Sequence, residues 1–400
     1  MLGDEPMPTL AKKEECTGCS ACINICPKKC LQMEIDKEGF LYPFLKNTEA
    51  CVECGMCSMI CPVHGNLEIQ NVQTQAYAAY TKDSDIRKSS SSGGIFSELG
   101  LQVLNQGGAV YGAAYGINYH VEHICVENVD DLERLHGAKY AQSRLNDSFS
   151  TVKERLNSGQ QVLFSGTPCQ VAGLKAFLQK DYPNLLTVDF VCHGVPSPAA
   201  WNNYVRYRAN LDNEGTLPVK INLRSKDTGW SRYQYSNKYQ YADGKTYSAR
   251  SGTDLYMKLF VGDYINRMSC ADCHFKGYNR VSDITLGDFW GIWDVVPEMD
   301  DDKGTSLVLL HSERGKIEFD KLSGRIQSKK VTLEQASASN PSLLYSSPAK
   351  PEREDVLQAV LNGDMELASG MIQMAGTKVK FGQRVLDKVK GMVRILGWRR

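Results

Sequence analysis

The chain has 400 residues, enough for two or three domains of ordinary size, with 42% hydrophobic and 23% charged residues. This composition excludes collagen-like, fully disordered and small disulfide-rich proteins. Lys and Arg together number 46, as do Asp and Glu, so the chain lacks the basic excess of a nucleic-acid-binding protein. No apolar run reaches the length of a signal peptide or of a membrane span of about 20 residues, so we expect a soluble, cytoplasmic protein.

Eight of the fourteen cysteines form two copies of the pattern C-x-x-C-x-x-C-x-x-x-C-P. This is the bacterial ferredoxin run, in which three thiolates hold one 4Fe-4S cluster and the fourth crosses to the other cluster. Zinc is the alternative, but four ligands from two pairs would leave the third cysteine and the proline of each run unexplained. The predicted ligands are Cys16, Cys19, Cys22 and Cys61 for the first cluster, and Cys51, Cys54, Cys57 and Cys26 for the second.

Between the two runs, residues 31–35 and 40–45 flank the turn 36–39 and predict a short hairpin. We therefore expect residues 1–75 to form a compact α+β ferredoxin domain with two clusters, ending after a short apolar stretch at 67–69. Cys30 has no place in the pattern and is interpreted as a small, partly buried residue.

Residues 76–335 alternate between strand and helix patterns, which predicts an α/β domain. The Ser/Gly-rich segment 89–94 precedes a predicted helix at 95–105, and such an entry offers free amides and a helix dipole to a phosphate. The alternative is a flexible capped loop. The chain contains neither a G-x-G-x-x-G after a predicted strand nor a P-loop, so any dinucleotide must bind by another route.

A strand, a sharp loop and a helix occur twice in succession, at 161–179 and at 185–209. In a right-handed βαβ unit both loops lie at the same edge of the sheet, which predicts that Cys169 and Cys192 approach one another. A hairpin at 232–251 follows, and then Cys270 and Cys273 in a C-x-x-C motif. These four thiolates match the requirement of a third 4Fe-4S cluster, and the alternative is a set of buried free thiols.

Six motifs occur together in this chain: residues 91–94, 137–143, 166–170, 192–194, 270–273 and 283–291. Over about residues 76–318 they resemble the coenzyme F420 hydrogenase/dehydrogenase beta-subunit family, whose members often carry a fused two-cluster ferredoxin domain. One departure is Ala138, where serine or another small residue is expected.

The resemblance implies a non-Rossmann site for flavin adenine dinucleotide (FAD) beside a 4Fe-4S cluster. The implied cluster ligands are Cys169, Cys192, Cys270 and Cys273. The implied flavin contacts are Ser91, Ser92, Gly93, Gly94, Lys139, Gln142, Ser143 and Thr167.

These features predict an FAD- and 4Fe-4S-dependent oxidoreductase that passes electrons between a low-potential carrier such as ferredoxin and a small-molecule substrate at the flavin. The substrate is coenzyme F420 or another acceptor, and the direction of electron flow is open. The alternative functions are an electron-transfer adaptor without its own substrate and a zinc-bound regulatory module. No catalytic acid or base is assigned, and His193 and His274 are interpreted as structural.

The C-terminal part is predicted to contain a linker or surface strap at 336–355 and a helical, basic tail at 356–400. Residues 376–400 carry eight Lys and Arg against the single acid Asp387, with an apolar stripe near helical spacing. Such a tail suits an anionic membrane surface or an acidic partner such as a ferredoxin, and the alternative is a solvated terminal helix.

Overall fold

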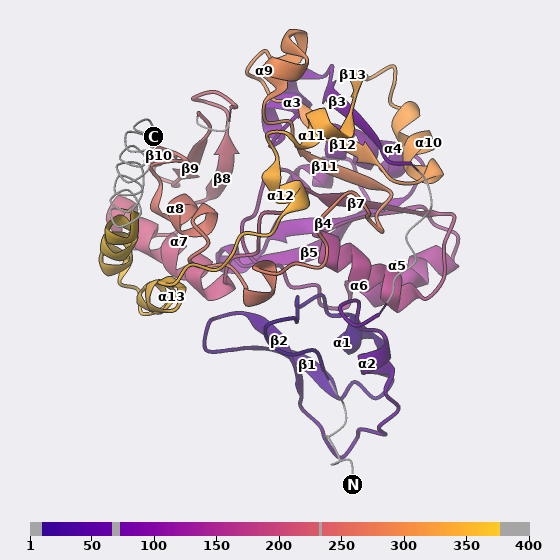
Figure 1. The fold of residues 1–400 in the computed structure, drawn as a ribbon, viewed down its shortest axis with the longest axis horizontal. Coiled ribbons are helices and arrows are strands. Elements are labelled where there is room, and N and C mark those ends of the chain that lie inside the picture. Colours follow the sequence, from indigo (N-terminus) through magenta and orange to yellow (C-terminus); the bar gives the residue numbers. More distant parts are fainter. Residues whose placement is uncertain (1–9, 66–72, 232–233, 377–400) are drawn as a thin grey trace, which may run out of the picture.

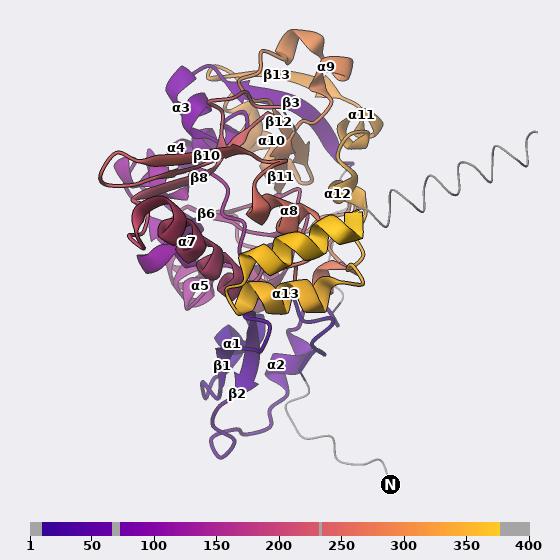
Figure 2. The ribbon, with the colours of Figure 1, turned by 90° about the vertical axis from the view of Figure 1, so that its left-hand side faces the viewer.

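The computed structural model describes residues 10–65, 73–231 and 234–376 (Figures 1 and 2). Its N-terminal domain contains α1 (Ala21–Ile25), β1 (Leu31–Ile35), β2 (Leu41–Leu45) and α2 (Met56–Met59). The strands β1 and β2 pair in antiparallel fashion, which confirms the predicted hairpin. Figure 1 shows this domain at one end of the molecule, below the larger body. The predicted apolar stretch at 67–69 lies outside the described residues.

The body is built on an eight-stranded mixed sheet. In spatial order its strands are β13 (Ile326–Val331), β3 (Gln75–Thr81), β12 (Ser306–Leu310), β11 (Ile284–Asp288), β7 (Leu185–Phe190), β6 (Val162–Ser165), β4 (Ala109–Tyr115) and β5 (Val121–Val126). The four strands β11, β7, β6 and β4 are parallel, so their carboxyl ends meet at one edge. The other pairs are antiparallel, a feature that the strand and helix patterns did not predict.

Helices cover both faces of this sheet because successive side chains of a strand point to opposite faces. Leu163 packs with residues of α4 (Ile95–Leu104), whereas Val162 and Phe164 pack with α5 (Ser148–Asn157) and α6 (Pro168–Leu178). The remaining helices of the body are α3 (Ser84–Ser89), α9 (Ile292–Val295), α10 (Glu313–Asp320), α11 (Leu333–Ser337) and the 3₁₀ turns η1 (Ile117–Tyr119), η2 (Asp130–Leu135), η3 (Met268–Cys270) and η4 (Pro297–Met299). The predicted β6–α6–β7 unit is confirmed, with β6 and β7 parallel neighbours.

A second lobe holds the antiparallel strands β8 (Lys220–Ser225), β9 (Ser236–Gln240) and β10 (Thr246–Arg250). The last two form the predicted hairpin, whose first two residues, 232–233, lie outside the described part of the chain. The helices α7 (Pro198–Asn213), α8 (Leu255–Val261) and α13 (Arg353–Leu361) complete this lobe. Its core is aromatic, with Trp201, Tyr204 and Tyr256 almost fully buried.

The segment predicted as a linker or surface strap, 336–355, is packed against the body. It contains α12 (Pro341–Leu344), and Ala336 and Leu343 are fully buried in the core below β3 and β12. Residues 365–376 form a further helix, which Figure 2 shows running beside α13. The basic tail from residue 377 onward lies outside the described residues. No helix in the described ranges is long and apolar enough to cross a bilayer.

Candidate functional site

The first thiol site is a cavity in the N-terminal domain. Its lining includes Cys16, Cys19, Cys22 and Cys61, the four cysteines predicted to hold the first cluster. Gly18 and Ser20 have positive φ angles of 69° and 62°, which turn the backbone sharply between the first two ligands and α1. Burial, with a smaller contribution from the neighbours Cys16 and Cys61, raises the pKa of the Cys19 thiol to about 12.

The second thiol site is a neighbouring cavity lined by Cys26, Cys51, Cys54 and Cys57. These are the four cysteines predicted to hold the second cluster, including Cys26, which crosses from the first run. Cys30 also lines this cavity, and its backbone N–H donates to the Cys26 sulfur over 3.3 Å. Cys54 is solvent-exposed, so this site lies at the surface of the molecule.

Both cavities have the donor set that a 4Fe-4S cluster needs. In a zinc site the sulfurs converge on one ion at about 2.3 Å. No three His, Cys, Asp or Glu side chains converge in this way within residues 10–65, 73–231 and 234–376. The cysteines instead line a cavity in each site, which leaves room for a cluster. Burial raises the pKa of the Cys19, Cys22 and Cys61 thiols, so binding a cluster through their thiolates would displace protons.

The third thiol site draws its cysteines from three separate segments of the body. Cys169 lies in the first turn of α6, Cys192 follows β7, and Cys270 and Cys273 lie at and just after η3. Cys169 interacts electrostatically with Cys192 and Cys273, and Cys270 does so with Cys169. Burial raises the pKa of Cys192 and of Cys270 to about 12. The fold therefore brings together the four cysteines that the sequence placed in one site.

A long cavity, here called the edge cavity, runs along the carboxyl edge of the four parallel strands. It is lined by residues 112–113 of β4, by 165–167 at the end of β6 and just beyond it, by 188–192 at the end of β7 and just beyond it, and by 286–288 of β11. At one end it contacts the loop before α4, and it also reaches Cys169, Cys192 and the first-site loop at Thr17 and Gly18. Ligands of open α/β sheets bind at this kind of edge.

Seven of the eight residues predicted as flavin contacts line the edge cavity: Ser91, Ser92, Gly94, Lys139, Gln142, Ser143 and Thr167. The exception is Gly93, which faces the sheet. Its N–H donates to the Ser306 hydroxyl over 2.9 Å, and a Cβ on it would collide with the main-chain oxygen of Ala79. Gly93 thus allows the loop to approach β3 and β12 closely.

Gln142 and Thr167 have structural partners as well. Gln142 accepts from the N–H of Leu41 over 2.9 Å, so its amide reaches the N-terminal domain. Thr167 forms a capping box with Gln170 at the start of α6, and its hydroxyl lies 3.1 Å from the Cys169 sulfur. The predicted helix after the Ser/Gly loop is confirmed as α4, and Gly94 at its N-cap makes no side-chain capping bond.

Lys139 and His136 set the charge of the edge cavity near α4. The Lys139 ammonium donates to the His136 carbonyl over 2.7 Å and to the Arg134 carbonyl over 3.3 Å. Burial lowers the pKa of Lys139 to about 7. Burial, with Lys139 nearby, lowers the pKa of His136 to about 4, and its Nε2 lies 2.9 Å from the Ser97 hydroxyl. Near neutral pH a bound anion would therefore draw Lys139 into its charged form.

A second, more open cavity shares one wall with the edge cavity. The shared residues are Tyr140, Phe190, Val191, Cys192, Gly194 and Asp288. Asp288 pairs with Arg224 at 2.8 Å, and the Arg224 guanidinium lies 3.9 Å from the ring centroid of Tyr235 and 5.0 Å from that of Trp290. Burial raises the pKa of Asp288, although Arg224 opposes this shift. A molecule in the open cavity would thus lie next to one in the edge cavity.

The two histidines beside the predicted ligands differ in their surroundings. The Nδ1 of His193 lies 3.3 Å from the Ser342 hydroxyl, and its Nε2 lies 2.9 Å from the Asp263 carboxylate but without the alignment of a hydrogen bond. This agrees with a structural role. His274 is exposed.

The first and third thiol sites approach one another across the boundary between the N-terminal domain and the body. Helix α1 packs against α6, and a Cβ on Gly173 of α6 would lie 2.9 Å from the Cys19 Cβ and 3.0 Å from its sulfur. Cys19 and Cys169 also interact electrostatically. Nothing in the sequence marks Gly173 as part of a site, because a glycine inside a helix pattern carries no sign of what it touches.

Two parts of the chain match known protein families. Residues 15–65 match the 4Fe-4S dicluster domain. Residues 159–337 match the family described as the C-terminal region of the coenzyme F420 hydrogenase/dehydrogenase beta subunit.

Among solved structures, one match is a chain of the F420-reducing [NiFe] hydrogenase complex from Methanosarcina barkeri. The likeness covers 75% of this chain and 91% of that chain, at 19% sequence identity and a TM-score of 0.44. No curated protein matches this chain.

Proposed function

We propose that this protein is an iron–sulfur flavoprotein oxidoreductase. In this proposal the three thiol sites hold 4Fe-4S clusters, the edge cavity holds FAD, and a small substrate exchanges electrons with the flavin from the open cavity. The observation that carries the proposal is the order of the sites. They run from the exposed Cys54, through the first and third thiol sites, to a cavity that Cys169 and Cys192 line.

Several features of the edge cavity suit FAD. The uncapped first turn of α4 offers backbone N–H groups beside the hydroxyls of Ser91 and Ser92, which suits a pyrophosphate. Lys139 adds a positive charge when an anion is present. FAD, once bound, exchanges single electrons with clusters and electron pairs with organic substrates. The protein's own residues bind and orient it, and the largely buried parallel strands keep water from one side of the cavity.

The surface at the second thiol site suits the contact with a redox protein. Cys54 is exposed, as are the apolar side chains of Val52 and Met59 near it, with exposed fractions of 58% and 73%. An electron carrier that docks there would approach the cluster without passing through the body. A ferredoxin fits this role, and the substrate class at the other end remains open between coenzyme F420 and another hydride or electron acceptor.

Anaerobic purification followed by iron, zinc and flavin analysis tests the proposal. We expect about 12 irons per chain, four for each of three clusters, with about one flavin and no stoichiometric zinc. A reduced artificial donor should then bleach the flavin. About 8 irons without flavin would refute it and favour an electron-transfer adaptor, and a colourless protein with zinc would favour a regulatory module.

A further inference from the structure

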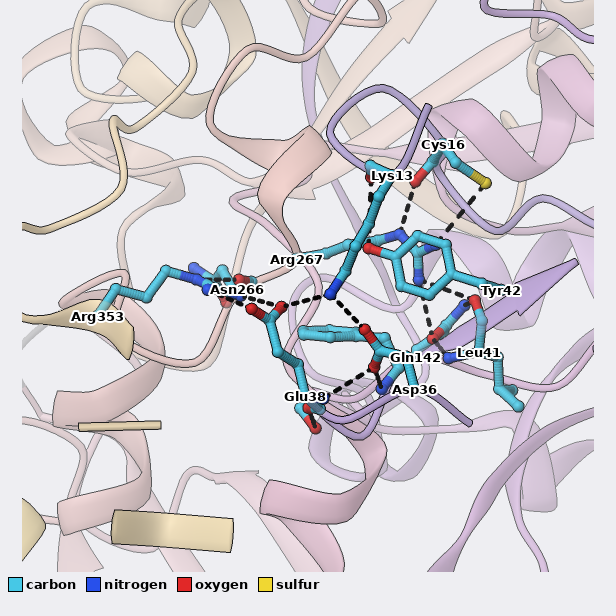
Figure 3. A network of polar contacts seen from close by, with 12 residues as sticks. Lys13, Cys16, Asp36, Glu38, Leu41, Tyr42, Gln142, Asn266, Arg267 and Arg353 are labelled. Carbon is cyan, nitrogen blue, oxygen red and sulfur yellow. Dashed lines mark hydrogen bonds and ion pairs between the residues drawn. The ribbon is translucent and has the colours of Figure 1, made fainter. Parts of the chain in front are cut away.

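Arg267 connects the body to the first thiol site. It belongs to the segment just before η3, yet its side chain inserts into the N-terminal domain, between Cys16 and the hairpin strand β2 (Figure 3). Its exposed fraction is 2%, one of the lowest for any large side chain among the described residues. A guanidinium buried to this degree is costly unless its donors and its charge are matched.

The donors of Arg267 are matched by four acceptors. Nε donates to the Cys16 carbonyl over 2.7 Å, and Nη1 donates to the Leu41 carbonyl over 3.0 Å and to the Gln142 side-chain oxygen over 3.3 Å. Nη2 lies 3.8 Å from the Cys16 sulfur. The guanidinium also lies 3.8 Å from the centroid of the Tyr42 ring, within the range of a cation–π contact.

The positive charge of Arg267, unlike its hydrogen-bond donors, lacks a full partner among these groups unless a cluster is bound. Of these four acceptors only the Cys16 sulfur can become an anion, and it does so when it ligates iron as a thiolate. The buried cation is therefore neutralised by a cluster in the first thiol site rather than by a carboxylate. Such a cluster gains one negative charge on reduction, so a fixed cation beside a ligand sulfur stabilises the reduced form.

The main chain of Arg267 reaches the third thiol site at the same time. Its carbonyl accepts from the N–H of Cys270 over 3.0 Å, and its N–H donates to the Val195 carbonyl over 2.9 Å. One residue thus contacts a ligand of the first site through its side chain and a ligand of the third site through its backbone. This fixes the two sites relative to one another.

Arg353 provides a contrast within the same boundary (Figure 3). It too is buried, and it donates to the Asn266 carbonyl over 2.8 Å and pairs with Glu38 at 3.1 Å. Glu38 in turn lies 3.6 Å from Lys13. Arg353 therefore holds the same two parts of the chain together but has a carboxylate partner, and its hydrogen bonds involve no cysteine.

We propose that Arg267 is a positioning residue that raises the reduction potential of the first cluster and fixes this cluster against the third site. The inference rests on the proposed function only in that the first thiol site holds a 4Fe-4S cluster. It needs neither flavin nor turnover.

The test is an anaerobic redox titration of the full-length protein followed by electron paramagnetic resonance. In Arg267→Met the equilibrium for reduction of one cluster should shift at least tenfold toward the oxidised form, which is about 59 mV for one electron. Arg267→Gln, which also removes the charge, should shift it in the same direction, and Arg267→Lys should stay within threefold of the parent. Arg353→Met should leave all potentials unchanged. The second cluster, identified by the signal that changes in Cys54→Ser, should not respond to any Arg267 variant.

Unchanged potentials in Arg267→Met with the full iron content would overturn the proposal, as would equal potentials in Arg267→Gln and Arg267→Lys. Arg267→Met and Arg267→Gln could instead lose the four irons of the first cluster. In that case, retention of this iron by Arg267→Lys supports the role of the charge, and its loss from Arg267→Lys refutes that role. A parent protein that carries clusters but no flavin would refute the proposed function. The potentials of the Arg267 variants could still be compared in such a protein.

Discussion

The contact between α6 and the first thiol site gives a prediction whose size follows from the structure. In Gly173→Ala the new Cβ would lie 2.9 Å from the Cys19 Cβ, 3.0 Å from its sulfur and 3.3 Å from its carbonyl oxygen. An ordinary contact needs at least 3.4 Å, so the helix and the ligand loop must separate by about 0.5 Å. A cluster in the first thiol site would hold Cys19, and the loop would then have little freedom to move.

Gly100→Ala in α4 is the matched control. The Cβ at this position would meet the methyl groups of Leu132 at 2.9 and 3.3 Å, which are the far end of a flexible side chain. Both substitutions gain about 1 kcal/mol of helix propensity. Overpacking against the fixed Cys19 costs about 1 to 3 kcal/mol. Gly173→Ala should therefore be less stable than Gly100→Ala by about that overpacking cost.

Anaerobic thermal unfolding of the loaded protein at one scan rate measures this difference. Each kcal/mol lowers the midpoint by roughly 2 to 4 °C for a domain of 150 to 250 residues. Gly173→Ala should also release iron to a chelator faster than the parent, because the added Cβ displaces Cys19, a proposed cluster ligand. Equal midpoints and equal rates of iron release for the two variants would refute the contact between α6 and the first thiol site.

Three further predictions concern the other parts of the chain. Cys270→Ser should lower the iron content from about 12 to about 8 per chain, and an unchanged content would exclude Cys270 as a ligand. Lys139 is charged below its pKa of about 7, so the affinity of pyrophosphate should fall as the pH rises through that value. Calorimetry should show that Lys139→Met abolishes this dependence, and a parent-like profile would contradict the assignment. Deletion after Gly376 removes eight basic residues and should weaken binding to anionic vesicles at low salt but not at high salt. Equal vesicle binding by both chains would assign the tail another role.

The parts of the site that could be predicted from the sequence are those in which chemistry fixes the spacing. Two-residue gaps between cysteines place three thiols around one cluster, whatever the rest of the fold. The sequence alone therefore predicted the cysteines of both N-terminal sites, including the exchange of Cys26 and Cys61 between the two runs. The β6–α6–β7 unit was predictable because apolar strands and helix patterns alternate there. That alternation alone places Cys169 and Cys192 at one edge of the sheet.

The parts that could not be predicted depend on contacts between distant segments. Arg267 follows no motif, and only the fold places it beside Cys16, 251 residues earlier in the chain. Gln142 was predicted as a flavin contact, and no pattern indicated that its amide also holds Leu41. The antiparallel half of the sheet was missed because a strand pattern does not give the direction of its neighbour.

The boundary between the two domains also bears on how the protein is made. Glu38 and its partner Arg353 are 315 residues apart, which a ribosome covers in roughly 15 to 60 s at about 5 to 20 residues per second. For most of that interval the N-terminal domain has been synthesised, but Arg353, which pairs with its hairpin, has not. A factor that loads clusters during translation would therefore meet the first thiol site before the body packs against it, whereas the second site stays at the surface of the folded protein.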